Sequence, residues 1–128
     1  MEPSLFGVVA EFSAPCDRGA AGLARVFTRG ALARLGYDGD HDDVVLVVSE
    51  LVSNALRHTA TVPVIRLAGD RHRVRVEVAD GSPVLPRRAS GEGWGLLLIQ
   101  RLTTAWGATP APGGKVVWCE MAADPGVR

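Results

Sequence analysis

One segment of the sequence alternates strictly between valine and charged side chains. Residues 73–78 read Arg-Val-Arg-Val-Glu-Val. Because successive side chains of a β-strand point to opposite faces, this pattern predicts a strand with one buried and one solvated face. A second apolar segment covers residues 62–67, and residues 69–72 between the two suit a short turn. We therefore expect two antiparallel neighbouring strands.

The segment from Asp42 to His58 has the spacing of an amphipathic helix. Its apolar side chains recur at helical intervals and form one broad sector, made of Val44, Val47, Val48, Leu51 and Ala55. Glu50, Asn54 and His58 stand four residues apart. Because residues at this spacing share one side of a helix, they form a polar stripe that borders the apolar sector.

The acidic cluster before this helix has two interpretations. Residues 38–43 contain four aspartates and one histidine, a set that could bind a metal ion. A helix N-terminus is the better account, because Asp40 can accept hydrogen bonds from the free N–H groups of the first turn. Asp42 and Asp43 then lie where the helix dipole favours negative charge. We expect a cap and no metal site here.

The remaining segments complete the predicted secondary structure. We expect an opening strand over residues 5–12 and a closing strand over residues 115–121. Residues 81–95, rich in Gly, Pro and Ser, predict a long loop, which in a compact domain is usually functional. A helix from Leu96 to about Thr104 follows, ended by Trp106-Gly107, with a turn over residues 110–114. An earlier helix, capped by Gly36, is indicated by apolar or small side chains at Ala20, Leu23, Phe27, Ala31 and Leu35.

Three features of this chain need a joint explanation. They are the Glu50 and Asn54 stripe, Asp80-Gly81 at the end of a buried strand, and a glycine pair before a helix. Each feature alone also occurs in ordinary solvated helix faces, hairpin turns and loops. Together, in this order, they resemble the ATP-binding domain shared by gyrase, Hsp90, histidine kinases and MutL.

More narrowly, the chain is similar to the small bacterial anti-sigma factor serine kinases of that superfamily. Residues 48–58, Val-Ser-Glu-Leu-Val-Ser-Asn-Ala-Leu-Arg-His, match their N-box, and residues 78–81 match the aspartate motif. Gly93-Trp94-Gly95-Leu96 matches the second glycine motif, and Ala24-Arg25-Val26 a triplet in the first helix. The resemblance implies an α+β Bergerat fold, a two-layer α/β sandwich whose mixed, mostly antiparallel sheet carries helices on one face. We expect one domain over residues 1–128, with its core at about 5–121.

The resemblance also implies a role for each matching residue. Asn54 would bind Mg²⁺ together with the ATP phosphates, a suitable task for a hard oxygen ligand. Glu50 would act as general base toward an acceptor hydroxyl or water. Asp80, followed by Gly81, would accept a hydrogen bond from the adenine amino group. Gly93 and Gly95, just before Leu96 starts its helix, would let backbone N–H groups approach the phosphates; Arg25 would contact a partner protein.

The loop contains both further candidates and departures from the family pattern. Arg87 and Arg88 lie where the family has its ATP lid, and they are either phosphate ligands or a solvated pair. Trp94 stands where this motif often has Arg, and it would either pack inside or mark a partner surface. After Asp80-Gly81 the usual second glycine is missing, since Ser82-Pro83 follows. Before the closing strand, Gly113-Gly114-Lys115-Val116 lacks the threonine commonly found there.

Composition narrows the classes of function. The 14 basic and 14 acidic side chains balance, and the arginines are scattered, which argues against a direct nucleic acid partner. Cys16 and Cys119 are too few for a secreted disulfide framework, so we expect reduced thiols. No apolar run is long enough to span a membrane, and Glu2 does not suit a signal peptide. We expect a cytoplasmic protein.

Two hypotheses about function follow from the resemblance. The first is an ATP-dependent, Mg²⁺-dependent serine/threonine kinase and anti-sigma regulator, which binds a sigma factor and phosphorylates a STAS-type antagonist protein, as a homodimer. The second is an interaction module of the same fold, with or without bound nucleotide, that performs no phosphotransfer. A detached histidine kinase catalytic domain ranks lower, because no dimerisation helix with a phospho-acceptor histidine precedes the domain.

Overall fold

The computed structural model describes residues 8–15, 17–58, 61–82 and 93–123. Within these ranges the chain forms five strands and three helices. The strands are β1 (Val8–Ser13), β2 (Val64–Gly69), β3 (Arg73–Asp80), β4 (Ala105–Ala111) and β5 (Gly114–Ala122). The helices are α1 (Ala20–Leu35), α2 (His41–His58) and α3 (Gly93–Leu102).

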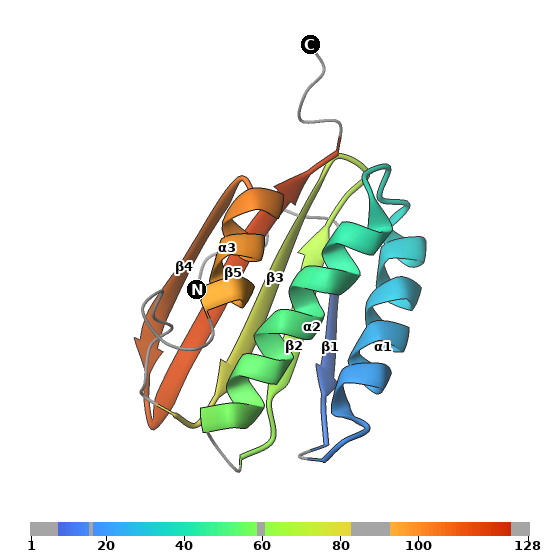
Figure 1. The fold of residues 1–128 in the computed structure, drawn as a ribbon. Helices are drawn as coiled ribbons and strands as arrows, with labels where there is room; N and C mark the ends of the chain where they lie inside the picture. Colours follow the sequence, from blue (N-terminus) through green and yellow to red (C-terminus); the bar gives the residue numbers. More distant parts are fainter. Residues whose placement is uncertain (1–7, 16, 59–60, 83–92, 124–128) are drawn as a thin grey trace.

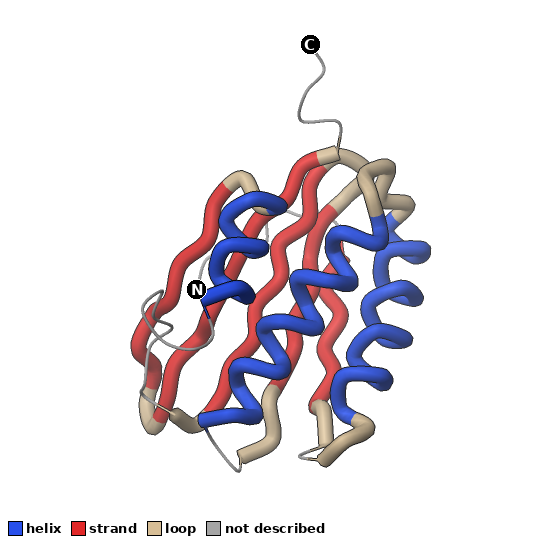
Figure 2. The backbone as a smooth tube through the Cα atoms, in the orientation of Figure 1, coloured by secondary structure: helices blue, strands red, loops and turns tan. Residues whose placement is uncertain are grey.

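The described elements form two layers. The five strands make one sheet in the order β1-β2-β3-β5-β4, and the three helices lie side by side over one of its faces (Figures 1 and 2). The α+β sandwich expected from the sequence is therefore confirmed. All four strand pairings are antiparallel, so the described sheet contains no parallel pair.

The alternation in residues 73–78 produces the buried face on which the helices lie. Val74, Val76 and Val78 of β3 are at most 1% exposed. Across the pairing with β5 they stand opposite Met121, Cys119 and Val117, which are also buried. From the helix layer, the predicted sector of α2 enters the same core, with Val44, Val47, Val48, Leu51 and Ala55 all buried.

Two predicted local signals, a turn and a cap, are confirmed by hydrogen bonds. The Asp70 carboxylate accepts the backbone N–H groups of His72 at 2.8 Å and Arg73 at 3.0 Å, closing the turn between β2 and β3. These hydrogen bonds lower the pKa of Asp70. Before α2, Asp40 accepts the N–H of Asp43 at 3.1 Å, and the described residues contain no cluster suited to a metal ion.

The first helix differs from its predicted pattern. Leu23 is 48% exposed, although the sequence placed it on the apolar side. The buried side instead includes Ala24, Thr28 and Leu32, none of which is accessible to solvent. The inward side of α1 is thus rotated from the predicted one, and Leu23 lies outside the core. Gly36 caps α1 as predicted, with φ of 69°.

Strand β4 was not predicted. The sequence indicated a helix to about Thr104 and irregular structure from Trp106 to Gly114, whereas residues 105–111 form an edge strand beside β5. Pro110 is tolerated there because an edge strand leaves one row of N–H groups without a ladder partner. Gly107 lies against the Trp118 ring, where an added Cβ would approach the ring's Cζ2 atom to 2.7 Å.

Cysteine labelling tests the packing of the sheet against the helices. Cys119 is fully buried, and burial raises the pKa of its thiol to about 12. Because the thiolate is the reactive form, we expect Cys119 in a Cys16→Ser variant to react with a thiol reagent at pH 8 only as fast as the protein unfolds. The same variant in denaturant is the control. Rapid labelling of the folded protein would contradict this packing.

Candidate nucleotide site

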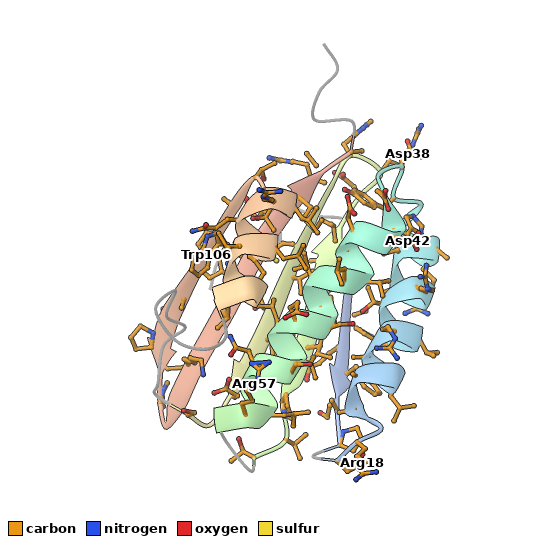
Figure 3. The ribbon with its side chains drawn as sticks, viewed as in Figure 1. Arg18, Asp38, Asp42, Arg57 and Trp106 are labelled. Carbon is orange, nitrogen blue, oxygen red and sulfur yellow. The ribbon has the colours of Figure 1, made fainter. Side chains whose placement is uncertain are left out.

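The flank of α2 that carries Glu50 and Asn54 faces away from α1. On the other flank, Asp42 binds Arg29 of α1 at 2.8 Å, near the start of α2 in Figure 3. Val45 follows Asp42 by one turn and is buried. Asn54 lies about two and a half turns after Val45, on the opposite side of the helix, with Glu50 one turn before it. Since α2 runs between α1 and α3 (Figure 1), this flank faces α3.

Asn54 has a buried oxygen with an unused hydrogen-bonding capacity. Its side-chain Oδ1 atom is inaccessible to solvent and has no hydrogen-bond partner within the described part of the chain. Burying an amide oxygen without a partner costs about 1–3 kcal/mol. A bound cation or ligand group would supply the missing partner of this oxygen. Glu50, one turn away, is half-buried.

Asp80, the last residue of β3, is paired with Lys115 of β5. The Lys115 Nζ atom donates to both carboxylate oxygens of Asp80, at 3.0 and 2.9 Å, and to the backbone oxygen of Ser82 at 3.3 Å. The two side chains are 1% and 4% exposed. The pair follows from the strand register, because Asp80 and Lys115 are direct partners and both point into the helix-covered face.

The backbone around Asp80 is equally confined. Ser82 donates its N–H to Asp80 Oδ1 at 2.8 Å, and Gly81 donates its N–H to the Thr61 hydroxyl at 2.9 Å. Gly114 lies so close that an added Cβ would overlap the backbone oxygen of Asp80. The aspartate motif is therefore enclosed by β5 on one side and by Thr61 on the other.

Helix α3 begins earlier than predicted. It starts at Gly93, so Gly93 and Gly95 belong to its first turn, and the predicted start at Leu96 is wrong by three residues. Glycine has a low helix propensity, which explains why the helix was predicted to start only after Gly95. In Figure 1 the start of α3, the C-terminal part of α2 and the end of β3 lie toward the same end of the sandwich.

Several predicted site residues lie outside the described part of the structure. Arg87 and Arg88 belong to residues 83–92, which are not described. Trp94 and Leu96 are placed in α3, but their side chains are not described. Arg25 is exposed on α1.

Comparison with known proteins identifies the family. The family model for the histidine kinase-like ATPase domain matches residues 13–121, which is most of the chain. The chain belongs to this family. A comparison with curated proteins gives no match.

Within this ATPase family, one similar solved structure is the crystal structure of the RsbU and RsbW domains of Rv1364c from Mycobacterium tuberculosis. The similarity has a TM-score of 0.68 at 25% sequence identity and covers 93% of this chain. It covers 34% of that longer chain, so only part of the relative corresponds to this ATPase domain. No helix within the described ranges is long and apolar enough to cross a membrane.

The candidate site has two ends, the metal end at Asn54 and the base end at Asp80. They differ in how well they would hold Mg²⁺ and ATP. Asn54 fits the metal end, because its buried Oδ1 is a hard oxygen without a partner among the described residues. Asp80 fits the base end poorly, because Lys115 and Ser82 already use its carboxylate and almost none of it is accessible. Lys115 was not predicted as a site residue from the sequence. Its signal was the strand register, which places residue 115 opposite residue 80.

A double-mutant cycle measures the Asp80–Lys115 pair. Removing one partner leaves a buried, uncompensated charge, so we expect Lys115→Met to lower the free energy of unfolding by about 3–5 kcal/mol. The double variant Asp80→Asn, Lys115→Met should cost clearly less than the sum of the two single changes. Chemical denaturation measures all four proteins. Additive effects would show that the two charges are not paired in solution.

Proposed function

We propose that this chain is an ATP-dependent regulator of the anti-sigma type that phosphorylates a serine or threonine of an antagonist protein and binds a sigma factor. The observation that carries the proposal is the buried oxygen of Asn54, which has no hydrogen-bond partner among the described residues. It lies one turn from Glu50 on the flank of α2 that faces α3. Family membership and the RsbW domain in the similar structure support it.

The chemistry divides between two residues on one helix. Asn54 Oδ1 would hold Mg²⁺, which when bound neutralises phosphate charge. Glu50 would accept the proton of the attacking serine or threonine hydroxyl, because a carboxylate one turn along the same flank can reach the same space. A rigid helix holds both groups, so their relative position does not depend on a loop.

The phosphates would bind at the start of α3. Gly93 and Gly95 lie in the first turn of this helix, where unpaired backbone N–H groups and the helix dipole favour an anion. Leu96 continues the helix. Arg87 and Arg88, which precede α3 in the sequence and lie outside the described residues, would add positive charge.

A partner surface is proposed on α1. Arg25 is exposed there, and its neighbours Leu23 and Val26 are 48% and 70% exposed. Exposed apolar side chains around an arginine are typical of protein interfaces. A sigma factor or a STAS-type antagonist would contact this surface. The proposal includes a homodimer in the cytoplasm.

A second candidate function is an interaction module of the same fold without phosphotransfer. The Asp80–Lys115 pair favours it, because a carboxylate held by an internal cation is less able to hold ATP. In that case partner binding through α1 would persist without nucleotide.

The kinase proposal is tested at Glu50. We expect Glu50→Gln to reduce phosphate transfer from labelled ATP to a serine-containing antagonist by at least about 100-fold, the usual scale for loss of a general base. Glu11→Gln, which removes an exposed carboxylate from β1, is the matched control and should retain activity. If Glu50→Gln transfers phosphate at the wild-type rate, Glu50 is not the base.

The partner surface is tested at Arg25. We expect Arg25→Glu to weaken binding to the cognate sigma factor at least about tenfold, since reversing an interfacial charge replaces attraction by repulsion. Arg34→Glu, also exposed but near the other end of α1, is the control. Titration calorimetry or surface plasmon resonance provides the affinities. Equal effects of both changes would assign the loss to net charge and not to this surface.

A further inference from the structure

Lys115 binds both carboxylate oxygens of Asp80, the two atoms that could accept a hydrogen bond from an adenine amino group. It is the only lysine of the chain, and it is buried at the point where β5 pairs with the last residue of β3. The Arg29–Asp42 pair is a useful contrast, because its side chains are 54% and 80% exposed. Asp80 and Lys115 are instead withdrawn from solvent, at 1% and 4%.

The hydrogen bonds of Lys115 leave it no free donor. An ammonium group has three N–H bonds, and its three acceptors are Asp80 Oδ1, Asp80 Oδ2 and the Ser82 carbonyl. Oδ1 of Asp80 also accepts the Ser82 N–H. The charges therefore cancel inside the protein, and neither side chain offers an accessible donor or acceptor to a ligand.

We propose that Lys115 is a specificity-determining residue that closes the base end of the nucleotide site. Adenine presents an amino group at its 6-position and needs an acceptor there, and Asp80 is the carboxylate that this family site would use. With Asp80 held by Lys115, nucleotides are bound through Mg²⁺ and the phosphates alone, without preference for adenine. This proposal rests on the nucleotide site of the proposed function, but not on phosphotransfer.

The pair closes the base end more firmly than a single hydrogen bond would, because both of its charges are buried. Because the Asp80 side chain is only 1% exposed, a ligand amino group could reach it only if Lys115 moved away, which would leave a buried cation uncompensated. A neutral ligand group cannot replace that charge. The pair is thus self-sufficient, and the metal and phosphate end, on α2 and α3, is left to supply the affinity.

Wild-type protein provides the first test. ATP and inosine triphosphate differ in the purine at the 6-position, where inosine has an oxo group and thus an acceptor, and at the adjacent N1, which in inosine carries a hydrogen. With Mg²⁺ present, we expect calorimetry to give affinities within about threefold of each other. A preference for ATP of tenfold or more that disappears in Asp80→Asn would overturn the proposal.

Replacement of the lysine provides the second test. We expect Lys115→Thr to bind ATP at least tenfold more tightly than wild type and to prefer ATP over inosine triphosphate. Arg75→Met is the matched control, because it removes a paired cation from the same sheet on its other face, beside Trp118. Circular dichroism checks folding, and Lys115→Met replaces the threonine variant should that one not fold.

Each result of these titrations either supports or overturns the proposal about Lys115. If wild type binds neither nucleotide, the metal and phosphate end does not supply the affinity on its own, and the proposal is overturned. Unchanged affinity and unchanged selectivity in the variant also overturn it. Failure of the proposed function looks different: phosphate transfer to the antagonist is then absent in every variant, while the nucleotide affinities still respond to Lys115.

Discussion

The packing of α2 against the central strand β3 determines the geometry of the rest of the molecule. Val44 and Val48 of the helix are inaccessible to solvent, as are Val74 and Val76 of the strand. Each fully buried valine contributes about 1.5–3 kcal/mol. Rotating α2 by one position would expose part of this sector and press Glu50 toward the core, where an unpaired charge costs several kcal/mol. The apolar sector thus orients the polar flank.

Periodic segments could be predicted from the sequence, and segments defined by their neighbours could not. The Val-charged alternation of β3 and the stripe of α2 are properties of consecutive residues, so they are visible without a fold. Strand β4 has no such alternation, because an edge strand with Gly107 and Pro110 depends on β5 for its conformation. The orientation of α1 also depends on its neighbours: packing against them buries Ala24 and leaves Leu23 exposed.

The candidate site shows the same division. Glu50 and Asn54 lie on one flank because of their spacing along a single helix, and this was predictable. The partner of Asp80 lies 35 positions away along the chain, and within the described residues the helix α3 and the strand β4 lie between the two. Only the register of β3 with β5 brings Lys115 opposite Asp80. The missing threonine could be read from the sequence, whereas the contact between Lys115 and Asp80 could not.

The metal end and the base end of the site depend on different elements, and this has a consequence for how such a domain can change. Asn54 is held by α2, whereas Asp80 is held by the pairing of β3 with β5. A substitution at the first residues of β5 therefore acts on the surroundings of Asp80 and not on the helix that carries Asn54. Because Gly114 and Lys115 are both buried against Asp80, changes at these positions act on the packing between β3 and β5 and leave the contact of α2 with the sheet in place. Membership of the ATPase family accordingly establishes the scaffold, and the register of β3 with β5 establishes which side chain stands opposite Asp80.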